Sequence, residues 1–334
     1  MKDKIALQLS HVTKIYTQWQ RSGKIKDVIK NLFAPEKREL VALDDLSLTI
    51  HQGEFVAYAG ANGAGKSTTI KILSGILQPS QGQVFVLGMN PAKQRIELMK
   101  RIGVLFGQRT ELWWDHPVIS SYEWKKAVWN ISDEIYEKTL KEVVELLDLS
   151  DILHTFSREL SLGQRMRADL GMMLLHRPEL IFLDEPTLGL DVLGKRQMIA
   201  FLKRIHQENK TTIVVTSHDM DDLEEMAERM ILLSKGKIAF DGDFYKLREV
   251  QGACSRIQIT VSGKAPVMED MNCISSEKNV YEYEFDTQKM NMAQVLALLS
   301  KQPDIRDIEI KKAPIEEVIA NLYLSWKQES INNQ

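Results

Sequence analysis

Short apolar runs alternate with longer segments of helical periodicity along most of this chain. Runs of strand type are predicted at residues 5–16, 41–50, 54–59, 83–88, 102–106, 180–183, 212–216 and 230–233. Apolar residues at every third or fourth position predict helices at residues 67–77, 91–100, 134–149 and 192–207. Strands that alternate with helices in this way indicate an α/β fold, in which a mostly parallel sheet carries helices on both faces.

The pattern changes character in two places. Residues 109–160 are mainly helical, and the helix expected at 134–149 has a wide apolar face formed by Ile135, Leu140, Val143, Val144, Leu146 and Leu147. We therefore expect a helical subdomain inserted into the α/β core, within a first domain at residues 1–247. From residue 248 onward, alternating strands and two helices predict a small separate α+β domain at residues 248–334.

The last predicted helix has an apolar stripe at the spacing i, i+3, i+4 and i+7. It is formed by Ile315, Val318, Ile319, Leu322, Tyr323 and Trp326. Such a stripe is expected to be buried, because a helix turns its apolar side away from water. It can pack within the small domain or form a contact between two copies of the chain.

A charged segment at residues 17–39 separates the first two predicted strands. Its lysines and arginines outnumber its acidic residues by three, so it could meet anionic lipid headgroups or a charged ligand. The alternative is a solvated amphipathic helix whose inward face is formed by Val28, Ile29, Leu32 and Phe33.

The composition is that of an ordinary globular protein, with 44% hydrophobic residues, 27% charged residues and a net charge of −3. No apolar run approaches the roughly 18 residues that a membrane span needs. The N-terminus shows no secretory signal, and the two cysteines, Cys254 and Cys273, are not spaced as metal ligands. We expect a chain that lies in the cytoplasm and does not cross a membrane by itself.

The stretch from Gly60 to Thr68 has the spacing of a phosphate-binding loop, a glycine followed after four residues by Gly-Lys-Ser. Glycines let backbone N–H groups curl around phosphate oxygens, and the first turn of the following helix adds unpaired donors. Lys66 would reach the β- and γ-phosphates, and Ser67 would hold Mg²⁺. The residues predicted to contact the nucleotide are Gly60, Asn62, Gly63, Ala64, Gly65, Lys66, Ser67 and Thr68.

Two carboxylates, Asp184 and Glu185, follow directly on the continuous apolar strand at residues 180–183. A carboxylate at the tip of a buried strand can hold Mg²⁺ through water, and this role is predicted for Asp184. Glu185 lies one residue further on and points differently, so it can polarise an attacking water as a general base. The loop and the strand together predict hydrolysis of a nucleotide as well as its binding.

Residues 160–164, Leu-Ser-Leu-Gly-Gln, lie 24 residues before Asp184 and resemble the signature motif of ATP-binding cassette (ABC) ATPases. Gln108 resembles the Q-loop of that family, residues 189–191 its D-loop, and His218 its switch histidine. The resemblance covers residues 5–245. It implies the fold of a P-loop NTPase of the ABC type, with ATP and Mg²⁺ as cofactors.

The resemblance also implies that two such domains hold two ATP molecules between them. In that arrangement Ser161 and Gly163 face the γ-phosphate bound by the partner, while His218 contacts the γ-phosphate of its own subunit. Further nucleotide contacts are implied for Tyr16, as an adenine-stacking aromatic, and for Gln164 and Asp191. Gln108 would have a catalytic role and contact Mg²⁺.

Two features depart from the family pattern. The third signature residue is usually glycine but is Leu162 here, and we expect phosphate contact to survive because Ser161 and Gly163 remain. The second departure is the charged insertion directly after Tyr16, the residue assigned to adenine stacking. The alternative role for Tyr16 is structural, because a tyrosine that ends a strand is more often a core or edge residue than a ligand contact.

The small C-terminal domain resembles the appendage on the ATPases of ABC-2-type exporters, including drug-resistance and viologen-exporter-like systems. Residues 107–115 resemble them as well. Polysaccharide exporters carry a similar signature variant and an N-terminal insertion. Their C-terminal domain is a longer all-β carbohydrate binder, however, which the helices predicted here argue against.

The leading hypothesis is therefore the ATPase subunit of a membrane exporter, peripheral on the inner face of the cell membrane, whose permease is a separate chain. It would act as a homodimer or with a related ATPase subunit. The alternative is an ABC ATPase that acts on nucleic acid or ribosomes. The single cassette, the lack of heptad repeats and the net charge of −3 count against it, so no nucleic-acid partner is expected. A nucleotide sensor without turnover is disfavoured by Glu185 and His218.

Four of the six tryptophans, Trp113, Trp114, Trp124 and Trp129, lie within 17 residues just after Gln108. In the ABC family a cytoplasmic helix of the permease inserts where the Q-loop meets the helical subdomain. Large aromatic residues are enriched at interface hot spots. The rings can form the core of the subdomain, as expected for Trp124 and Trp129, or line a docking groove, as expected for at least one of Trp113 and Trp114.

Overall fold

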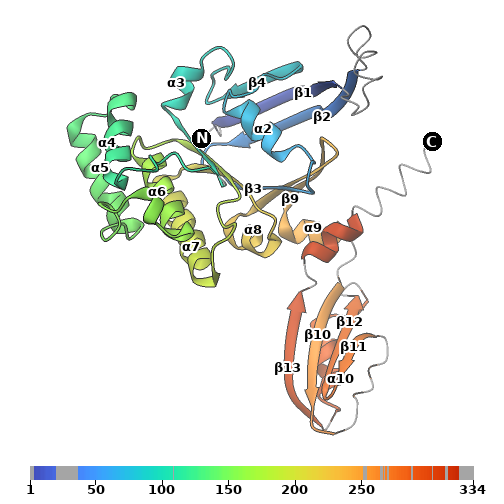
Figure 1. The fold of residues 1–334 in the computed structure, drawn as a ribbon. Coiled ribbons are helices and arrows are strands. Elements are labelled where there is room, and N and C mark those ends of the chain that lie inside the picture. The colour runs from blue at the N-terminus through green and yellow to red at the C-terminus, as the bar shows by residue number, and fades with distance from the viewer. Residues whose placement is uncertain are drawn as a thin grey trace, which may run out of the picture. The chain divides into compact units, whose positions relative to one another are not determined.

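The computed structural model describes residues 4–19, 37–107, 109–250, 254–263, 266, 268, 271–286, 289–302, 304–312 and 315–322. The chain divides into two compact units, Met1–Asp241 and Gly242–Gln334 (Figure 1). The division falls at residue 242 rather than 248, because helix α9 (Phe244–Val250) clusters with the second unit. In the described part of the chain, no helix combines the length and the apolar character needed to cross a membrane.

The first unit is built on a six-stranded sheet with the strand order β5-β6-β7-β3-β8-β9. Five of its strands pair in parallel, as the sequence predicted, and these are β3 (Phe55–Gly60), β5 (Ile102–Phe106), β6 (Leu180–Asp184), β7 (Thr212–Thr216) and β8 (Arg229–Ser234). Every residue of β3 and β7 is buried, which explains their nearly continuous apolar sequence.

Strand β9 (Lys237–Asp243) is an edge strand that the sequence did not predict. It follows β8 through a two-residue turn, Lys235–Gly236, in which both residues have positive φ. Turns of this kind connect antiparallel strands. None of the residues of β9 is fully buried, so its sequence lacks the apolar pattern that marks the inner strands.

A second, antiparallel sheet has the strand order β2-β1-β4 and consists of β1 (Ile5–Trp19), β2 (Lys37–His51) and β4 (Gln81–Val86). The sequence predicted these strands but not their separation from the parallel sheet. Helix α2 (Lys66–Leu73) contacts strands of both sheets, and the main core fills the space between them (Figure 1). Residues 20–36, and with them the amphipathic helix expected in the charged segment, lie outside the described residues.

Three helices, α4 (Val118–Trp129), α5 (Asp133–Leu146) and α6 (Leu162–Leu174), form the helical region. Helix α6 packs against both of the others, so this region extends beyond residue 160. The predicted apolar face of α5 is partly wrong. Ile135 is 49% exposed, whereas Tyr136, Thr139 and Val143 are buried. The buried face of α5 is therefore centred on these three positions and not on Ile135.

Among the described residues of the first unit, the other helices are α3 (Arg95–Met99), α7 (Val192–Asn209), α8 (Met220–Met226) and a 3₁₀ turn at Ser157–Glu159. Helix α3 is shorter than the predicted helix at 91–100. The side chain of Asn90 accepts hydrogen bonds from the backbone nitrogens of Ala92 and Lys93, at 3.0 and 3.2 Å, which holds those residues in a turn instead.

The second unit contains a four-stranded antiparallel sheet with the order β11-β12-β10-β13. Its strands are β10 (Cys254–Val261), β11 (Asn272–Glu277), β12 (Val280–Asp286) and β13 (Ile305–Lys312), and its core includes residues of helix α10 (Met292–Leu299). Residues 315–322 are helical, and the part of the predicted stripe that is described, Ile315, Val318, Ile319 and Leu322, is buried within the chain itself. Tyr323 and Trp326 lie outside the described residues.

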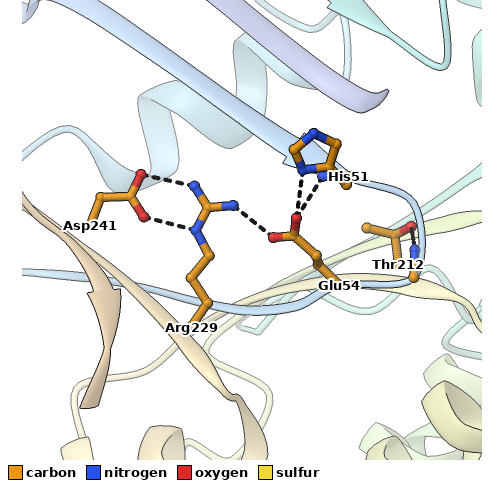
Figure 2. A network of polar contacts seen from close by, with 6 residues as sticks. His51, Glu54, Thr212, Arg229 and Asp241 are labelled. Atoms are coloured by element: carbon orange, nitrogen blue, oxygen red, sulfur yellow. Dashed lines mark hydrogen bonds and ion pairs between the residues drawn. The ribbon is translucent and has the colours of Figure 1, made fainter. Parts of the chain in front are cut away.

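Arg229, the first residue of β8, joins the ends of several strands (Figure 2). It donates two hydrogen bonds to Asp241 of β9, both of 2.8 Å, and a third from Nη1 to Glu54 Oε2, of 2.7 Å. The other oxygen of Glu54 accepts from the backbone nitrogen of His51 at 3.0 Å. Burial alone would raise the pKa of Glu54, but the bonds from Arg229 and His51 outweigh it and lower that pKa.

Replacing Arg229 with Leu is expected to lower the free energy of unfolding by about 1–3 kcal/mol, because two partly buried carboxylates lose their charged donor. The matched control is Arg204→Leu, which breaks an exposed pair with Glu208 and is expected to cost no more than about 0.5 kcal/mol. Denaturant unfolding of the two variants measures the difference. Equal effects would show that the Arg229 cluster does not stabilise the sheet.

Candidate functional site

The predicted phosphate loop connects β3 to α2, and two of its glycines lie where no side chain fits. A Cβ atom on Gly60 would lie 2.6 Å from the carbonyl oxygen of Leu233, and one on Gly65 would lie 2.7 Å from that of Ala42. Gly65 also has a φ of +112° and forms the N-cap of α2. The loop is therefore closed tightly against β2 and β8, which only glycine allows at these positions.

Lys66, the first residue of α2, is buried, with 7% of its surface exposed. Its Nζ donates hydrogen bonds to the carbonyl oxygens of Gly60, at 2.6 Å, and of Ala61, at 3.3 Å. Burial lowers the pKa of Lys66, while the nearby carboxylates of Glu185 and Asp184 act in the opposite direction. The fold thus brings the loop cation and both predicted acidic residues to one place.

Asp184, at the end of β6, is held between the phosphate loop and β7. Ser67 Oγ donates to Asp184 Oδ2 at 3.0 Å, and Thr216 Oγ1 donates to Asp184 Oδ1 at 2.7 Å. A serine hydroxyl beside a carboxylate oxygen at this edge of the sheet is a set of oxygen ligands that suits Mg²⁺. The residues present therefore fit the metal that the sequence predicted.

Thr216 is a site residue that the sequence reasoning missed. Its hydroxyl also accepts from the backbone nitrogen of Glu185 at 3.1 Å, so it positions both carboxylate residues. Asp184 pairs with Thr216 in the parallel register of β6 and β7. Since the carboxyl ends of parallel strands meet at one edge of a sheet, the polar residue that ends the apolar run at 212–216 could have indicated this position.

Glu185 and His218 face each other across the same edge. The distance between His218 Nε2 and Glu185 Oε1 is 2.5 Å. Glu185 has a φ of +60°, which is uncommon for a residue with a side chain and turns it away from the direction of β6. The prediction that Glu185 points differently from Asp184 agrees with this backbone.

Gly107 fixes the chain on the other side of Asp184. Its backbone nitrogen donates to the carbonyl oxygen of Asp184 at 2.7 Å, and a Cβ atom here would lie 2.6 Å from that oxygen. Gln108 itself lies outside the described residues.

Tyr16 lies near the end of the phosphate loop. Its hydroxyl lies 3.5 Å from Thr68 Oγ1, which places this aromatic residue next to the start of α2.

The remaining predicted contacts form a second cluster. Ser161 is the N-cap of α6, where its hydroxyl accepts from the nitrogen of Gln164 and its own nitrogen donates to Gln164 Oε1. Asp191 is the N-cap of α7. Ser161, Gly163, Gln164 and Asp191 line one pocket of about 750 Å³, and no residue of the phosphate loop lines it.

Three of the four clustered tryptophans are partly open to solvent. Trp113 is 39% exposed and Trp114 51%, and the rings of Trp113 and Trp124 lie 5.6 Å apart. Trp124 is also exposed, so the expectation that it lies in the core is wrong. Trp129 is only partly exposed, beneath Lys125 Nζ at 3.6 Å. We call Trp113, Trp114 and Trp124 the aromatic patch.

Comparison with known proteins agrees with the resemblance to ABC ATPases found in the sequence. The family model described as "ABC transporter" matches residues 43–188. The chain is 35% identical over 215 residues to the uncharacterized ABC transporter ATP-binding protein YhcH of Bacillus subtilis, covering 64% of this chain and 68% of YhcH. It is 30% identical over 217 residues to the ABC transporter ATP-binding protein NatA of the same organism, covering 65% of this chain and 88% of NatA.

Further similarity extends to other transporters and to solved structures. The energy-coupling factor transporter ATP-binding protein EcfA2 of Clostridium perfringens is 33% identical over 217 residues, covering 64% of this chain and 75% of EcfA2. The dimeric cassette MJ0796 bound to ADP and Pi superposes with a TM-score of 0.59 at 26% identity, covering 71% of this chain and 98% of the other. The chain therefore belongs to the ABC transporter family, as one of its ATP-hydrolysing ATP-binding proteins.

Proposed function

We propose that this chain is the ATPase subunit of an ABC-2-type exporter and works as a nucleotide-sandwich dimer that drives a separate permease. The observation that carries the coupling to a permease is the aromatic patch, which is exposed and begins at Trp113, a short way after Gln108 in the sequence. Large exposed aromatic rings side by side are typical of surfaces that a partner covers.

In this proposal the loop nitrogens and Lys66 bind the phosphates of ATP. Ser67 and Asp184 would hold Mg²⁺, which neutralises charge on the β- and γ-phosphates when it is bound. Glu185 accepts a proton from the attacking water as general base. His218, 2.5 Å from one carboxylate oxygen of Glu185, orients that carboxylate so that its second oxygen can face the water.

A dimer is proposed because the predicted nucleotide contacts fall into two separate clusters. The pocket that contains Ser161 and Gly163 has no phosphate-loop residue in its lining, so these residues need the nucleotide of a second copy. Leu162 and Leu193, which line this pocket, and Val192, next to Leu193 in the sequence, are all exposed apolar residues. A partner subunit would remove them from water, which supports association through this face.

The exporter subtype is supported by the small second unit, whose antiparallel sheet and helix α10 form a core of their own. A helix in this unit disfavours the longer all-β domain of polysaccharide exporters. Docking on a permease would hold the chain on the inner face of the cell membrane. The alternative, an ABC ATPase that acts on nucleic acid or ribosomes, predicts copurification with RNA or DNA instead.

Replacing Trp113 and Trp114 together with Ala tests the docking surface. When the chain is co-expressed with the membrane protein encoded next to it, the double variant is expected to lose at least about 90% of the copurifying permease, because hot-spot residues contribute 2 kcal/mol or more each. The ATPase activity of the isolated chain should change little. The matched control is Ile96→Ala, at an exposed apolar residue outside the aromatic patch.

Normal copurification by the double variant would contradict the docking surface, and so would its unfolding, since core residues would then be involved. Nucleic acid that copurifies in place of a membrane protein would favour the alternative function.

A further inference from the structure

His218 stands on a short link between two fixed points. The first is Thr216, the last residue of β7, which pairs with Asp184 in the parallel sheet. The second is Asp219, the N-cap residue of helix α8. Only Ser217 and His218 lie between them, and three residue steps span no more than about 11 Å even when extended. The position of His218 therefore depends on where Asp219 is held.

Asp219 is held through both of its carboxylate oxygens. Oδ1 accepts a hydrogen bond from the backbone nitrogen of Asp222 at 3.2 Å, which caps α8. Oδ2 accepts from Lys195 Nζ at 2.6 Å. The backbone nitrogen of Asp219 also donates to Ser217 Oγ at 3.0 Å, which closes the turn around His218. The bonds to Asp222 and Ser217 are local, whereas the bond from Lys195 ties Asp219 to a different helix.

Lys195 is placed by the segment that follows Glu185. It is the fourth residue of α7, and its backbone nitrogen donates to the carbonyl oxygen of Asp191, the N-cap of that helix, at 2.9 Å. Helices α7 and α8 pack against each other (Figure 1), so Lys195 can reach Asp219. The neighbouring His218 then closes a ring of contacts, because its Nε2 lies 2.5 Å from Glu185 Oε1.

The ammonium group of Lys195 lies between two carboxylates. Asp222 Oδ2 is 3.1 Å from Nζ as well, and Asp222 is buried. The hydrogen bond to Asp219 and the approach of Asp222 raise the pKa of Lys195, while the bond from Lys195 lowers the pKa of Asp219. Lys195 and Asp219 are therefore charged at neutral pH. Without the cation, the two carboxylates would repel each other directly beside His218.

We propose that Lys195 is a positioning residue for ATP hydrolysis, which holds Asp219 so that the neighbouring His218 stays within reach of Glu185. The proposal rests on the proposed function, in which Glu185 is the general base and His218 orients its carboxylate. It assigns to Lys195 an effect on the chemical step and not on the binding of ATP.

The first test compares steady-state ATP hydrolysis by the full chain and by its variants Lys195→Met and Lys195→Arg. Met keeps an unbranched side chain without the charge, and it is expected to lower kcat by about 10-fold, because a misplaced catalytic group slows the chemical step. KM for ATP should change by less than about 2-fold. Arg keeps the charge and several donors, so it should restore kcat to within about 3-fold of the unmodified chain. An unchanged kcat for Lys195→Met, or no rescue by Arg, would contradict the proposal.

Lys203→Met is the matched control. Lys203 lies eight residues further along α7, which is about 12 Å on the same helix, and the substitution removes the same charge. This variant is expected to keep a normal kcat, and thermal melting of both variants shows whether the fold is retained. Equal losses of kcat in both would mean that the charge on α7, rather than the contact with Asp219, matters for hydrolysis.

A chain that carries Lys195→Met together with His218→Ala tests whether Lys195 acts through His218. The His218→Ala variant by itself is expected to hydrolyse ATP at least about 10-fold more slowly in a single turnover. If Lys195 acts through His218, adding Lys195→Met should lower that rate by less than about 2-fold further, because the two changes are then not additive. A further 10-fold loss would reveal an independent structural role and overturn the proposal.

Asp219→Asn gives a milder test, should Lys195→Met fail to fold. Asn caps a helix as well as Asp does, so α8 keeps its start while Lys195 loses a charged partner. We expect kcat to fall by about 3-fold, and an unchanged kcat would contradict the proposal.

His218→Ala also separates this proposal from the proposed function. If it lowers kcat and Lys195→Met does not, Lys195 is not a positioning residue and the role of His218 stands. A normal kcat for His218→Ala would remove both roles.

Discussion

The Glu185→Gln variant is expected to bind ATP normally and to hydrolyse it at least about 100-fold more slowly than the unmodified chain. A general base contributes roughly 10²- to 10⁴-fold to such a reaction, and the amide of glutamine cannot accept the proton of the attacking water. The shape of the side chain is kept, and its backbone nitrogen still donates to Thr216. The loss should therefore fall on kcat, with little change in ATP affinity.

Phosphate release at saturating ATP measures this loss, and titration with a fluorescent ATP analogue measures binding. Because bound ATP is no longer consumed, size-exclusion chromatography with ATP is expected to show a larger dimer fraction for the variant. Glu179→Gln is the matched control, since Glu179 lies just before β6, at its opposite end, and pairs with Arg101. Hydrolysis at the normal rate by Glu185→Gln would exclude Glu185 as the base.

The inner strands of the parallel sheet could be predicted because each strand's burial is visible in its own short stretch of sequence. A strand that is covered on both faces has a continuous apolar run, as β6 and the middle of β7 do, and a polar residue then marks its end. The phosphate loop could also be recognised from a short stretch of sequence, since its glycines are required by close contacts that any such loop makes with neighbouring strands. The loop predicted Lys66, and the end of the apolar strand predicted Asp184.

The edge elements could not be predicted in the same way. Strand β9 has no buried face, and the separation of β1, β2 and β4 into their own sheet depends on pairing between residues far apart in the chain. The face of α5 was misjudged for a related reason. Its sequence permits several apolar stripes, and only contact with α6 decides that Tyr136 is buried and Ile135 exposed.

The candidate site shows the same limit. The sequence pattern indicated Glu185, and the family resemblance indicated His218. Their side chains approach to 2.5 Å where Glu185 has a positive φ, and residue propensities do not predict a positive φ for glutamate. Thr216 was missed because it acts through a hydrogen bond to another segment. A threonine at a strand end is not a motif by itself.

Replacing Lys66 with Ala is expected to weaken ATP binding by roughly 100-fold and to reduce hydrolysis below detection. Lys66 is buried, and its Nζ donates hydrogen bonds to the carbonyl oxygens of Gly60 and Ala61 in the loop. Phosphate oxygens of bound ATP can replace these two carbonyl oxygens as acceptors. Each hydrogen bond to a charged group contributes about 1.5–3 kcal/mol, and at the lower end of this range the loss of two, about 3 kcal/mol, corresponds to a factor of roughly 100. Without the cation, the carboxylates of Asp184 and Glu185 would also repel the phosphates.

Equilibrium titration with ATP and a phosphate-release assay measure the two effects, and thermal melting without nucleotide checks the fold. Lys71→Ala is the matched control, because Lys71 lies on the same helix, in its last turn, and outside the phosphate loop. The control should bind and hydrolyse ATP normally. Because Ala at position 66 keeps helix α2 and removes only bonds to loop carbonyls, the variant should melt within a few degrees of the unmodified chain. ATP binding that survives in a folded Lys66→Ala variant would mean that the backbone nitrogens alone hold the phosphates and that Lys66 is not needed for binding.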